Sequence, residues 1–216
     1  MGHSTVRVML AGGTGVVGKD LIRHSRARGD HLIAVGRRPT GLADEELIID
    51  FNALPQLPRA DVAICALGTT IKNAGSRDAF RAVDHGAVLA YAKAALEAGI
   101  EHFLVVTAVG ADPASSVFYS RVKGEIQQDL CDLGFSRLDI LQPGLLLGER
   151  QEKRPVETLL KTLAPIADRL MTGRWRRYRS IHSAAVAECL LTLTNATEAG
   201  VFIHQYDEIQ QSLSHP

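Results

Sequence analysis

A tyrosine and a lysine stand four residues apart near the middle of this chain, in the run FYSRVKGE at residues 118–125. On a helix this spacing places Tyr119 and Lys123 on one face, a turn apart. A phenol has an ordinary pKa of about 10, and a neighbouring ammonium favours its ionised form. We therefore expect Lys123 to lower the pKa of Tyr119, so that Tyr119 can exchange a proton with a carbonyl oxygen. The alternative is a tyrosine packed on its helix beside a solvated lysine.

Thr107 closes a predicted strand, and its hydroxyl is the candidate for a third member of this constellation. Ligands of open parallel sheets gather at the carboxyl ends of the strands. We expect the Thr107 hydroxyl to hold the same carbonyl oxygen that Tyr119 would protonate.

Near the N-terminus an apolar run, Val6–Ala11, leads into a turn with a glycine at every third position and then into a helical pattern. A strand, a phosphate-sized turn and a helix start are the order that a dinucleotide requires. Gly12 is expected to permit the tight turn, Gly15 to let a pyrophosphate approach the backbone, and Gly18 to let the helix pack closely. The helix start adds unpaired N–H groups and the positive end of its dipole. An ordinary Gly-rich turn is the alternative.

Two arginines, Arg37 and Arg38, follow the next predicted strand, His31–Gly36. NAD sites usually carry an acidic residue there, which accepts a hydrogen bond from the ribose 2′-hydroxyl. A guanidinium can instead hold two oxygens of a 2′-phosphate. The pair therefore favours NADP(H) over NAD(H), against the alternative of two solvated surface arginines.

Later residues offer further contacts to such a cofactor. Asp50 can accept from the exocyclic amine of an adenine while Phe51 flanks the ring, although an exposed aspartate at a strand end would look the same. In the run Leu67-Gly68-Thr69, the glycine lets the backbone approach the cofactor and the threonine can hydrogen-bond a ribose or a phosphate. The ammonium of Lys123 can also bond the hydroxyls of the nicotinamide ribose.

Short β-like runs alternate with helical patterns almost to the end of the chain, which predicts parallel βαβ units. The expected fold is α/β, a Rossmann-like doubly wound parallel sheet with helices on both faces. The predicted strands are Val6–Ala11, His31–Gly36, Leu47–Asp50, Ala60–Cys65, His102–Thr107, Arg137–Gln142 and Gly200–His204. The predicted helices are Gly15–Arg28, Asp78–Ala98 (with a break near Val83 left open), Phe118–Leu133, Val156–Leu170, Ser183–Thr194 and Asp207–Leu213.

Composition narrows the function classes. The 216 residues fit one domain better than two. A formal net charge of zero gives no general attraction to nucleic acid or to acidic membranes. The three cysteines form no C-x-x-C pair and the eight histidines show no metal-ligand spacing, so no disulfide framework and no metal are expected. We find no secretory signal and no apolar run long enough to span a bilayer, and we expect a cytoplasmic protein.

One basic run with interleaved aromatic residues, Arg174–Arg179, is of a type that can bind nucleic acid. The zero net charge and the lack of an accompanying basic face argue against that function. We interpret the run as a substrate-side loop that leads into a late strand, and we expect no nucleic-acid partner.

In these motifs the chain resembles the atypical short-chain dehydrogenases/reductases, and most closely their small Tat-interacting-protein-type members. The matching pieces are residues 12–18, 36–38, 67–70, 110–112, 119–125, 143–144 and 150–155. The resemblance implies a Rossmann-type fold, NADPH as cofactor, Tyr119 as proton carrier and Lys123 as its partner. It also implies that Thr14, Gly15, Val16 and Val17, together with Leu146 and Arg154, line the cofactor. Thr107 stands where related proteins often carry serine.

The sequence thus predicts a single-domain NADPH-dependent oxidoreductase of a small carbonyl substrate, with the residues from about 144 covering that substrate. A second hypothesis is an NADPH-binding regulator that binds a protein partner without turnover, since fold alone does not establish function. A complete Tyr–Lys pair favours chemistry, because a sensor needs no activated phenol. A protein partner or a homodimer is left open.

Overall fold

Strands and helices alternate along the computed structural model, which describes residues 5–148, 168–169 and 171–213. Seven strands form one sheet, and every neighbouring pair in it is parallel. Their order is β3-β2-β1-β4-β5-β6-β9, so the direction of winding reverses between β1 and β4. The strands are β1 (Arg7–Ala11), β2 (His31–Gly36), β3 (Glu45–Ile48), β4 (Val62–Cys65), β5 (His102–Val106), β6 (Arg137–Leu141) and β9 (Gly200–His204).

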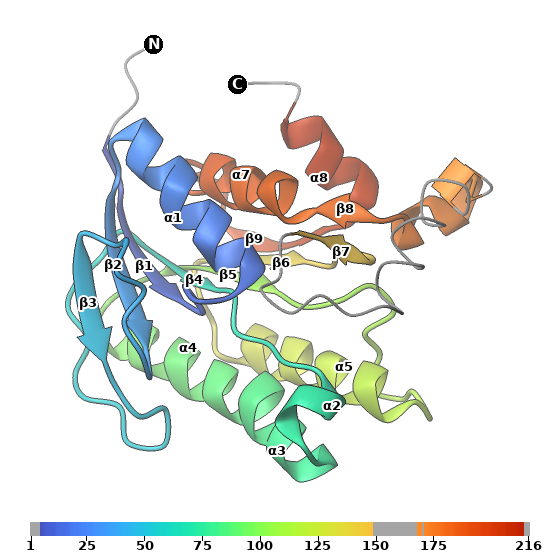
Figure 1. The fold of residues 1–216 in the computed structure, drawn as a ribbon, viewed down its shortest axis with the longest axis horizontal. Helices are drawn as coiled ribbons and strands as arrows, with labels where there is room; N and C mark the ends of the chain where they lie inside the picture. Colours follow the sequence, from blue (N-terminus) through green and yellow to red (C-terminus); the bar gives the residue numbers. More distant parts are fainter. Residues whose placement is uncertain (1–4, 149–167, 170, 214–216) are drawn as a thin grey trace.

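Helices cover both faces of this sheet (Figure 1). One face carries α1 (Val16–Arg28), α7 (Ser183–Leu193) and α8 (Tyr206–Ser212). The other carries α4 (Val88–Glu97) and α5 (Phe118–Asp132), with the short α2 (Ile71–Ala74) and α3 (Arg77–Arg81) leading into α4. The predicted doubly wound α/β fold is therefore confirmed.

The central strands are apolar on both sides because both faces of the sheet are covered. In β1 the side chains alternate between two cores. Val8 and Leu10 pack in the cluster under α1 and α7, whereas Met9 and Ala11 pack in the cluster under α4 and α5. The sheet thereby holds the carboxyl ends of its strands at one rigid edge.

The helix predicted over residues 78–98 is continuous but not uniform. Between α3 and α4 the residues Ala82–Ala87 form a π-helical segment, η1. Such wide turns inside α-helices are frequent at functional sites. Here η1 places a buried aspartate, Asp84, against α5.

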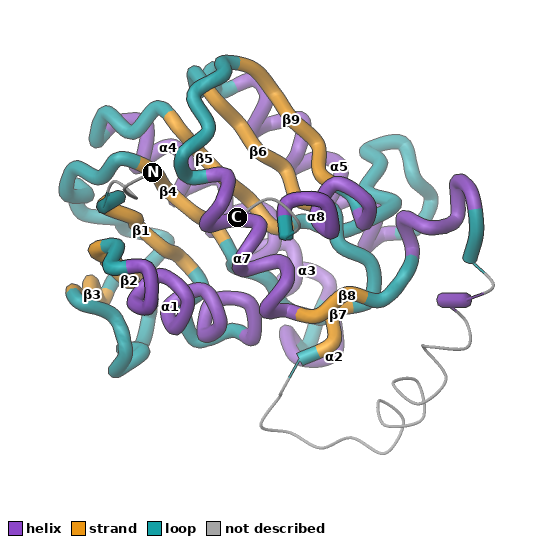
Figure 2. The backbone as a smooth tube through the Cα atoms, turned by 90° about the horizontal axis from the view of Figure 1, so that it is seen from above, coloured by secondary structure: helices purple, strands orange, loops and turns teal. Residues whose placement is uncertain are grey.

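After β6 the chain leaves the main sheet. A second, two-stranded sheet pairs β7 (Leu146–Leu147) with β8 (Ile181–His182) in parallel, and the 3-10 helix η2 (Gly173–Tyr178) precedes β8. Figure 2 shows this pair of strands beside α7 and near the start of α1. The helix predicted over residues 156–170 lies almost wholly outside the described residues.

A buried ionic cluster joins the last three strands of the sheet. Asp139 of β6 has no exposed surface. Its carboxylate lies 2.8 Å from His102 Nε2 of β5 and 2.7 Å from His204 Nε2 of β9. Arg137 donates to both of its oxygens, at 2.6 and 2.8 Å. Burial raises the pKa of Asp139, but the hydrogen bonds from His102, His204 and Arg137 outweigh it and hold that pKa well below its usual range.

Candidate functional site

The glycine turn after β1 is fixed by backbone contacts at its first and third glycines. Gly12 has a φ of +93°, and a Cβ there would lie 2.4 Å from the carbonyl carbon of Ala66. A Cβ on Gly18 would lie 2.3 Å from the carbonyl oxygen of Gly12. Only glycine therefore permits this turn, its contact with the end of β4 and the close approach of α1.

Gly15 is less tightly enclosed than these two glycines. Gly15 is exposed with a φ of −75°, and the nearest atom to a Cβ there would be the Gly12 oxygen, at 3.3 Å. Helix α1 begins just after it with no side-chain cap and no acidic residue in its first turn. The N–H groups of that turn therefore suit an anion, and the positive end of the helix dipole adds to the attraction. Thr14 is exposed and Val16 half-buried beside them, while Val17 is buried.

A cleft extends from this turn to the arginine pair. Its wall contains Gly12 and Thr14, Arg37 and Arg38 after β2, and Leu67 after β4. Both arginines are exposed, and neither forms an ion pair with a described residue. The cleft therefore joins the glycine turn to two exposed guanidiniums.

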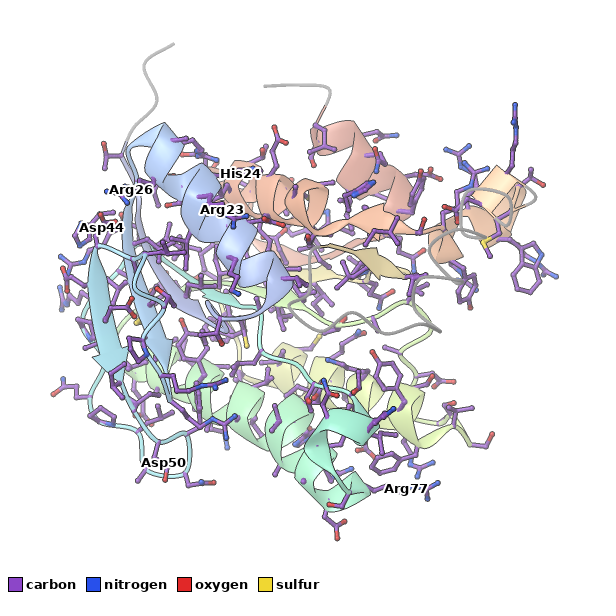
Figure 3. The ribbon with its side chains drawn as sticks, in the orientation of Figure 1. Arg23, His24, Arg26, Asp44, Asp50 and Arg77 are labelled. Atoms are coloured by element: carbon purple, nitrogen blue, oxygen red, sulfur yellow. The ribbon has the colours of Figure 1, made fainter. Side chains whose placement is uncertain are left out.

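Phe51, which follows β3, lines the cleft, whereas Asp50 does not. Asp50 Oδ1 accepts from the backbone N–H of Asn52 at 3.0 Å and from its side-chain amide at 2.9 Å. Figure 3 shows Asp50 in the loop that hangs below β3. One oxygen of Asp50 is therefore used in a local turn, because aspartate readily bonds the backbone two residues ahead. The adenine contact of Asp50 stays a prediction.

Lys123 forms an ion pair that the sequence did not predict. Its ammonium lies 2.7 Å from Asp84 Oδ1, and the two side chains are only 5% and 1% exposed. The other oxygen of Asp84 accepts from the N–H of Thr69 at 2.8 Å. Gly68 lies over the pair, with its ideal Cβ 3.5 Å from Asp84 Oδ1 and 3.9 Å from Lys123 Nζ. The loop after β4 is thus connected to α5 through Asp84.

Tyr119 lies one turn before Lys123, with its ring 5.5 Å from that of Phe80. Its hydroxyl makes no hydrogen bond within the described part of the chain. Burial raises the pKa of Tyr119, the Lys123 ammonium lowers it, and the Asp84 carboxylate raises it again. The resulting pKa lies above the ordinary value, so the expectation of a lowered pKa is wrong for the free protein. The sequence argument counted the lysine but neither the burial nor the aspartate.

The hydroxyl of Thr107 is already engaged. It donates to the carbonyl of Leu141 at 3.2 Å and accepts from Gln127 Nε2 at 2.7 Å. Gln127 in turn accepts from Gln142 at 2.9 Å. Thr107 is buried, and its only proton is used inside the protein. The described geometry therefore does not support the expected bond from Thr107 to a substrate oxygen.

The segments after β6 pass close to this site. An ideal Cβ on Gly148, just after β7, would lie 2.6 Å from Ser183 Oγ and 3.4 Å from Val16 Cβ. Leu146 of β7 is half-buried against the core under α1. The chain following β7 therefore reaches the start of α1, where the cofactor is expected. Arg154 lies outside the described residues.

Most of the basic run 174–179 lies in the 3-10 helix η2, where a loop was predicted, and the run leads into β8. Arg176 donates three hydrogen bonds to Asp207 of α8, and Arg179 donates to the carbonyl of Met171. A Cβ on Gly110 would lie 3.8 Å from the ring of Tyr178, so η2 packs on the loop that follows β5. Within residues 5–148, 168–169 and 171–213, no group of His, Cys, Asp and Glu could hold a metal ion. Over the same residues no helix is long and apolar enough to cross a bilayer.

The reversal of strand order, the glycine turn and the adjoining cleft define a Rossmann-type dinucleotide-binding fold. Solved structures share it. A putative NAD-dependent epimerase/dehydratase from Bacillus halodurans matches with a TM-score of 0.69 and 17% identity, covering 98% of this chain and all of that one. Human epimerase family protein SDR39U1, solved with NADPH, matches with a TM-score of 0.66 and 21% identity over 92% of this chain and 74% of that one.

The chain belongs to the HIM1 family, whose model matches residues 37–174. Protein fmp52, mitochondrial, of Aspergillus niger is 35% identical over 181 residues, which cover 77% of each chain. Protein HTATIP2 of Rattus norvegicus is 36% identical over 166 residues, covering 71% of this chain and 68% of the rat protein. The expected relationship to the atypical short-chain dehydrogenases/reductases is thereby confirmed.

The expected cytoplasmic location is contradicted by these relatives. The Aspergillus niger protein and its counterparts in Aspergillus fumigatus and Coccidioides immitis all carry the word mitochondrial in their names. The sequence argument rested on the lack of a secretory signal and on unpaired cysteines. Those features argue against the secretory route and say nothing about the other compartments of a cell.

Proposed function

We propose that the chain is an NADPH-dependent oxidoreductase that reduces a small carbonyl compound. The observation that carries this proposal is the cleft that joins the glycine turn to Arg37 and Arg38. The residues fit the cofactor: the exposed Gly15 and the uncapped start of α1 suit a pyrophosphate. The two exposed arginines suit a 2′-phosphate.

When bound, a reduced nicotinamide supplies a hydride to the substrate carbon. The protein's part is to bind, orient and provide the proton. Tyr119, whose hydroxyl makes no bond in the described structure, donates its proton to the carbonyl oxygen. Lys123 lies beside it as the cation that stabilises the phenolate formed. The residues from about 144 cover the substrate in this proposal, which is supported by Gly148 beside the start of α1 and by Tyr178 beside the loop after β5.

The affinities for NADPH and NADH test the assignment of Arg37 and Arg38 to the 2′-phosphate. Arg38→Ala removes a charge-assisted bond worth about 1.5–3 kcal/mol, so its Kd for NADPH is expected to rise about 10- to 150-fold. The Kd for NADH should stay unchanged, as measured by calorimetric titration. Arg23→Ala is the matched control, because Arg23 lies on α1, pairs with Asp20 and is absent from the cleft wall (Figure 3). Equal losses for NADPH and NADH in Arg38→Ala would refute the assignment.

The rate of carbonyl reduction tests whether Tyr119 is the proton donor. Tyr119→Phe keeps the ring against Phe80 but removes the hydroxyl, so NADPH binding should persist while reduction of a panel of small aldehydes and ketones is lost. Unchanged reduction rates in this variant would assign the proton to another group.

A second candidate is an NADPH-binding regulator that binds a protein partner without turnover. The engaged hydroxyl of Thr107 favours it, because Thr107 then has no proton left to hold a substrate oxygen beside Tyr119. Under this candidate the wild-type protein binds NADPH and reduces no carbonyl compound in the panel. The names of the fungal relatives also lead us to propose a mitochondrial location, which a fluorescent fusion would test.

A further inference from the structure

The Lys123–Asp84 pair is buried more deeply than a surface ion pair. Both side chains are nearly without exposed area, and their charged atoms lie 2.7 Å apart. Removing two charges from water is costly, and a buried pair adds little to stability compared with apolar residues of the same size. A role in the site therefore explains this pair better than stability does.

The carboxylate of Asp84 is held from several directions. The N–H of Thr69 fixes one oxygen and the Lys123 ammonium contacts the other. Asp84 belongs to η1, and Phe80, one turn earlier, packs on the ring of Tyr119. The same stretch of helix thus supports the ring of Tyr119 and fixes the cation beside it.

The two charges of the pair act on Tyr119 in opposite directions. The ammonium of Lys123 favours the phenolate, whereas the carboxylate of Asp84 and burial of the ring favour the phenol. A phenol is the form that gives a proton to a carbonyl oxygen, and a phenolate is the form that takes one from an alcohol.

We propose that Asp84 is a positioning residue that fixes the Lys123 ammonium and keeps Tyr119 protonated, so that the site is set for carbonyl reduction and not for alcohol oxidation. The catalytic meaning of this inference rests on the proposed function. In reduction the O–H bond of Tyr119 breaks, and its proton forms the O–H bond of the product alcohol. The carbonyl carbon gains the hydride that NADPH supplies, so the carbonyl is reduced and the nicotinamide is oxidised. The Tyr119 phenolate, stabilised by Lys123, then takes a proton from water.

The test uses the full chain without cofactor. Ionisation of Tyr119 is followed as the ultraviolet absorbance of phenolate during a pH titration, and the same titration of Tyr119→Phe is subtracted. Circular dichroism at each pH reports whether the protein is folded. Asp84→Asn retains an oxygen for the Thr69 N–H but loses the negative charge. We expect Tyr119 to ionise at lower pH in Asp84→Asn than in the wild type.

Asp129→Asn is the matched control, because Asp129 also joins η1 and α5, through a 2.8 Å contact with His85, but lies at the surface. In Asp129→Asn, Tyr119 should ionise at the same pH as in the wild type. Equal ionisation of Tyr119 in Asp84→Asn and the wild type, or ionisation only on unfolding in both, would overturn the proposal. If Asp84→Asn does not fold, Asp84→Glu takes its place, because it keeps the negative charge. Tyr119 should then ionise at the same pH as in the wild type. Ionisation of Tyr119 at lower pH in Asp84→Glu would overturn the proposal.

The pH profile of reduction gives the second readout. The rate should fall as Tyr119 loses its proton, and in Asp84→Asn that fall should move to lower pH with KM unchanged. A lower rate without a shifted profile would indicate a structural role only and would refute the proposal. Should no carbonyl compound be reduced by the wild type, the proposed function fails while the titration still decides the role of Asp84.

Discussion

Replacing Asp139 by asparagine is expected to destabilise the protein strongly without touching the cofactor cleft. The substitution removes the negative charge that Arg137, His102 and His204 share at 2.6–2.8 Å. The guanidinium of Arg137, in a side chain that is 8% exposed, would keep its 2.7 Å bond to the carbonyl of Glu198 and its place over the Phe202 ring but would lose its anionic partner. Breaking a buried pair on one side costs about 3–5 kcal/mol. For a chain of this length that corresponds to a Tm lower by roughly 6–20 °C.

Thermal and urea unfolding of the two proteins at neutral pH would measure this loss. The pH dependence has a defined sign. Because the folded-state pKa of Asp139 is depressed, its contribution is complete above the unfolded pKa, about 3.9, and disappears as the pH falls through the folded value. The difference between wild type and Asp139→Asn should therefore shrink in strong acid.

Asp129→Asn serves as the control here as well, because its partner His85 pairs with it near the surface and such pairs contribute about 0–1 kcal/mol. A loss in Asp139→Asn no larger than that of the control would show that the cluster does not stabilise the sheet. A difference that grows in acid would contradict the assigned charge of Asp139.

Two further outcomes are expected. Gly15→Ala should weaken NADPH binding by about tenfold or more, because its Cβ would stand on the exposed side of the turn where a pyrophosphate is expected. It should lower Tm less than Gly12→Ala does, because Gly12 has a positive φ and a Cβ there would lie much closer to the backbone after β4. The reverse pattern, by calorimetry and thermal melts, would refute these roles. Alkylation followed by mass spectrometry should label the exposed Cys131 first. Burial raises the pKa of the Cys65 thiol to about 12, so it should react only after unfolding, and early labelling would contradict its burial.

Strands bounded by turn residues can be predicted closely from the sequence. The patterns of His31–Gly36 and Gly200–His204 give both strands with their observed limits. The third strand was predicted at 47–50 but runs over Glu45–Ile48, because an edge strand with polar residues lacks a clear apolar pattern. The pair β7–β8 carries no local signal, since each of its two-residue strands exists only through pairing with the other.

The site was predictable where spacing along the chain sets the geometry. The glycines of the turn and the Tyr119–Lys123 spacing belong to this kind. Asp84 was not predictable, because it is far from Lys123 in sequence and reaches it only through the π-helical register of η1. The position of Thr107 at a strand end was right, but the amides that engage its hydroxyl come from α5 and β6.

The helix that presents the glycine turn is covered by a helix from the other end of the chain. Helices α1 and α7 lie side by side, and Ser183 Oγ donates to Asp20 at 2.6 Å (Figure 1). During synthesis, α1 therefore leaves the ribosome long before the surface that shields its apolar side exists. The nascent N-terminal half therefore exposes the apolar side of α1 until α7 has been made, and transiently exposed apolar surface of this kind promotes aggregation.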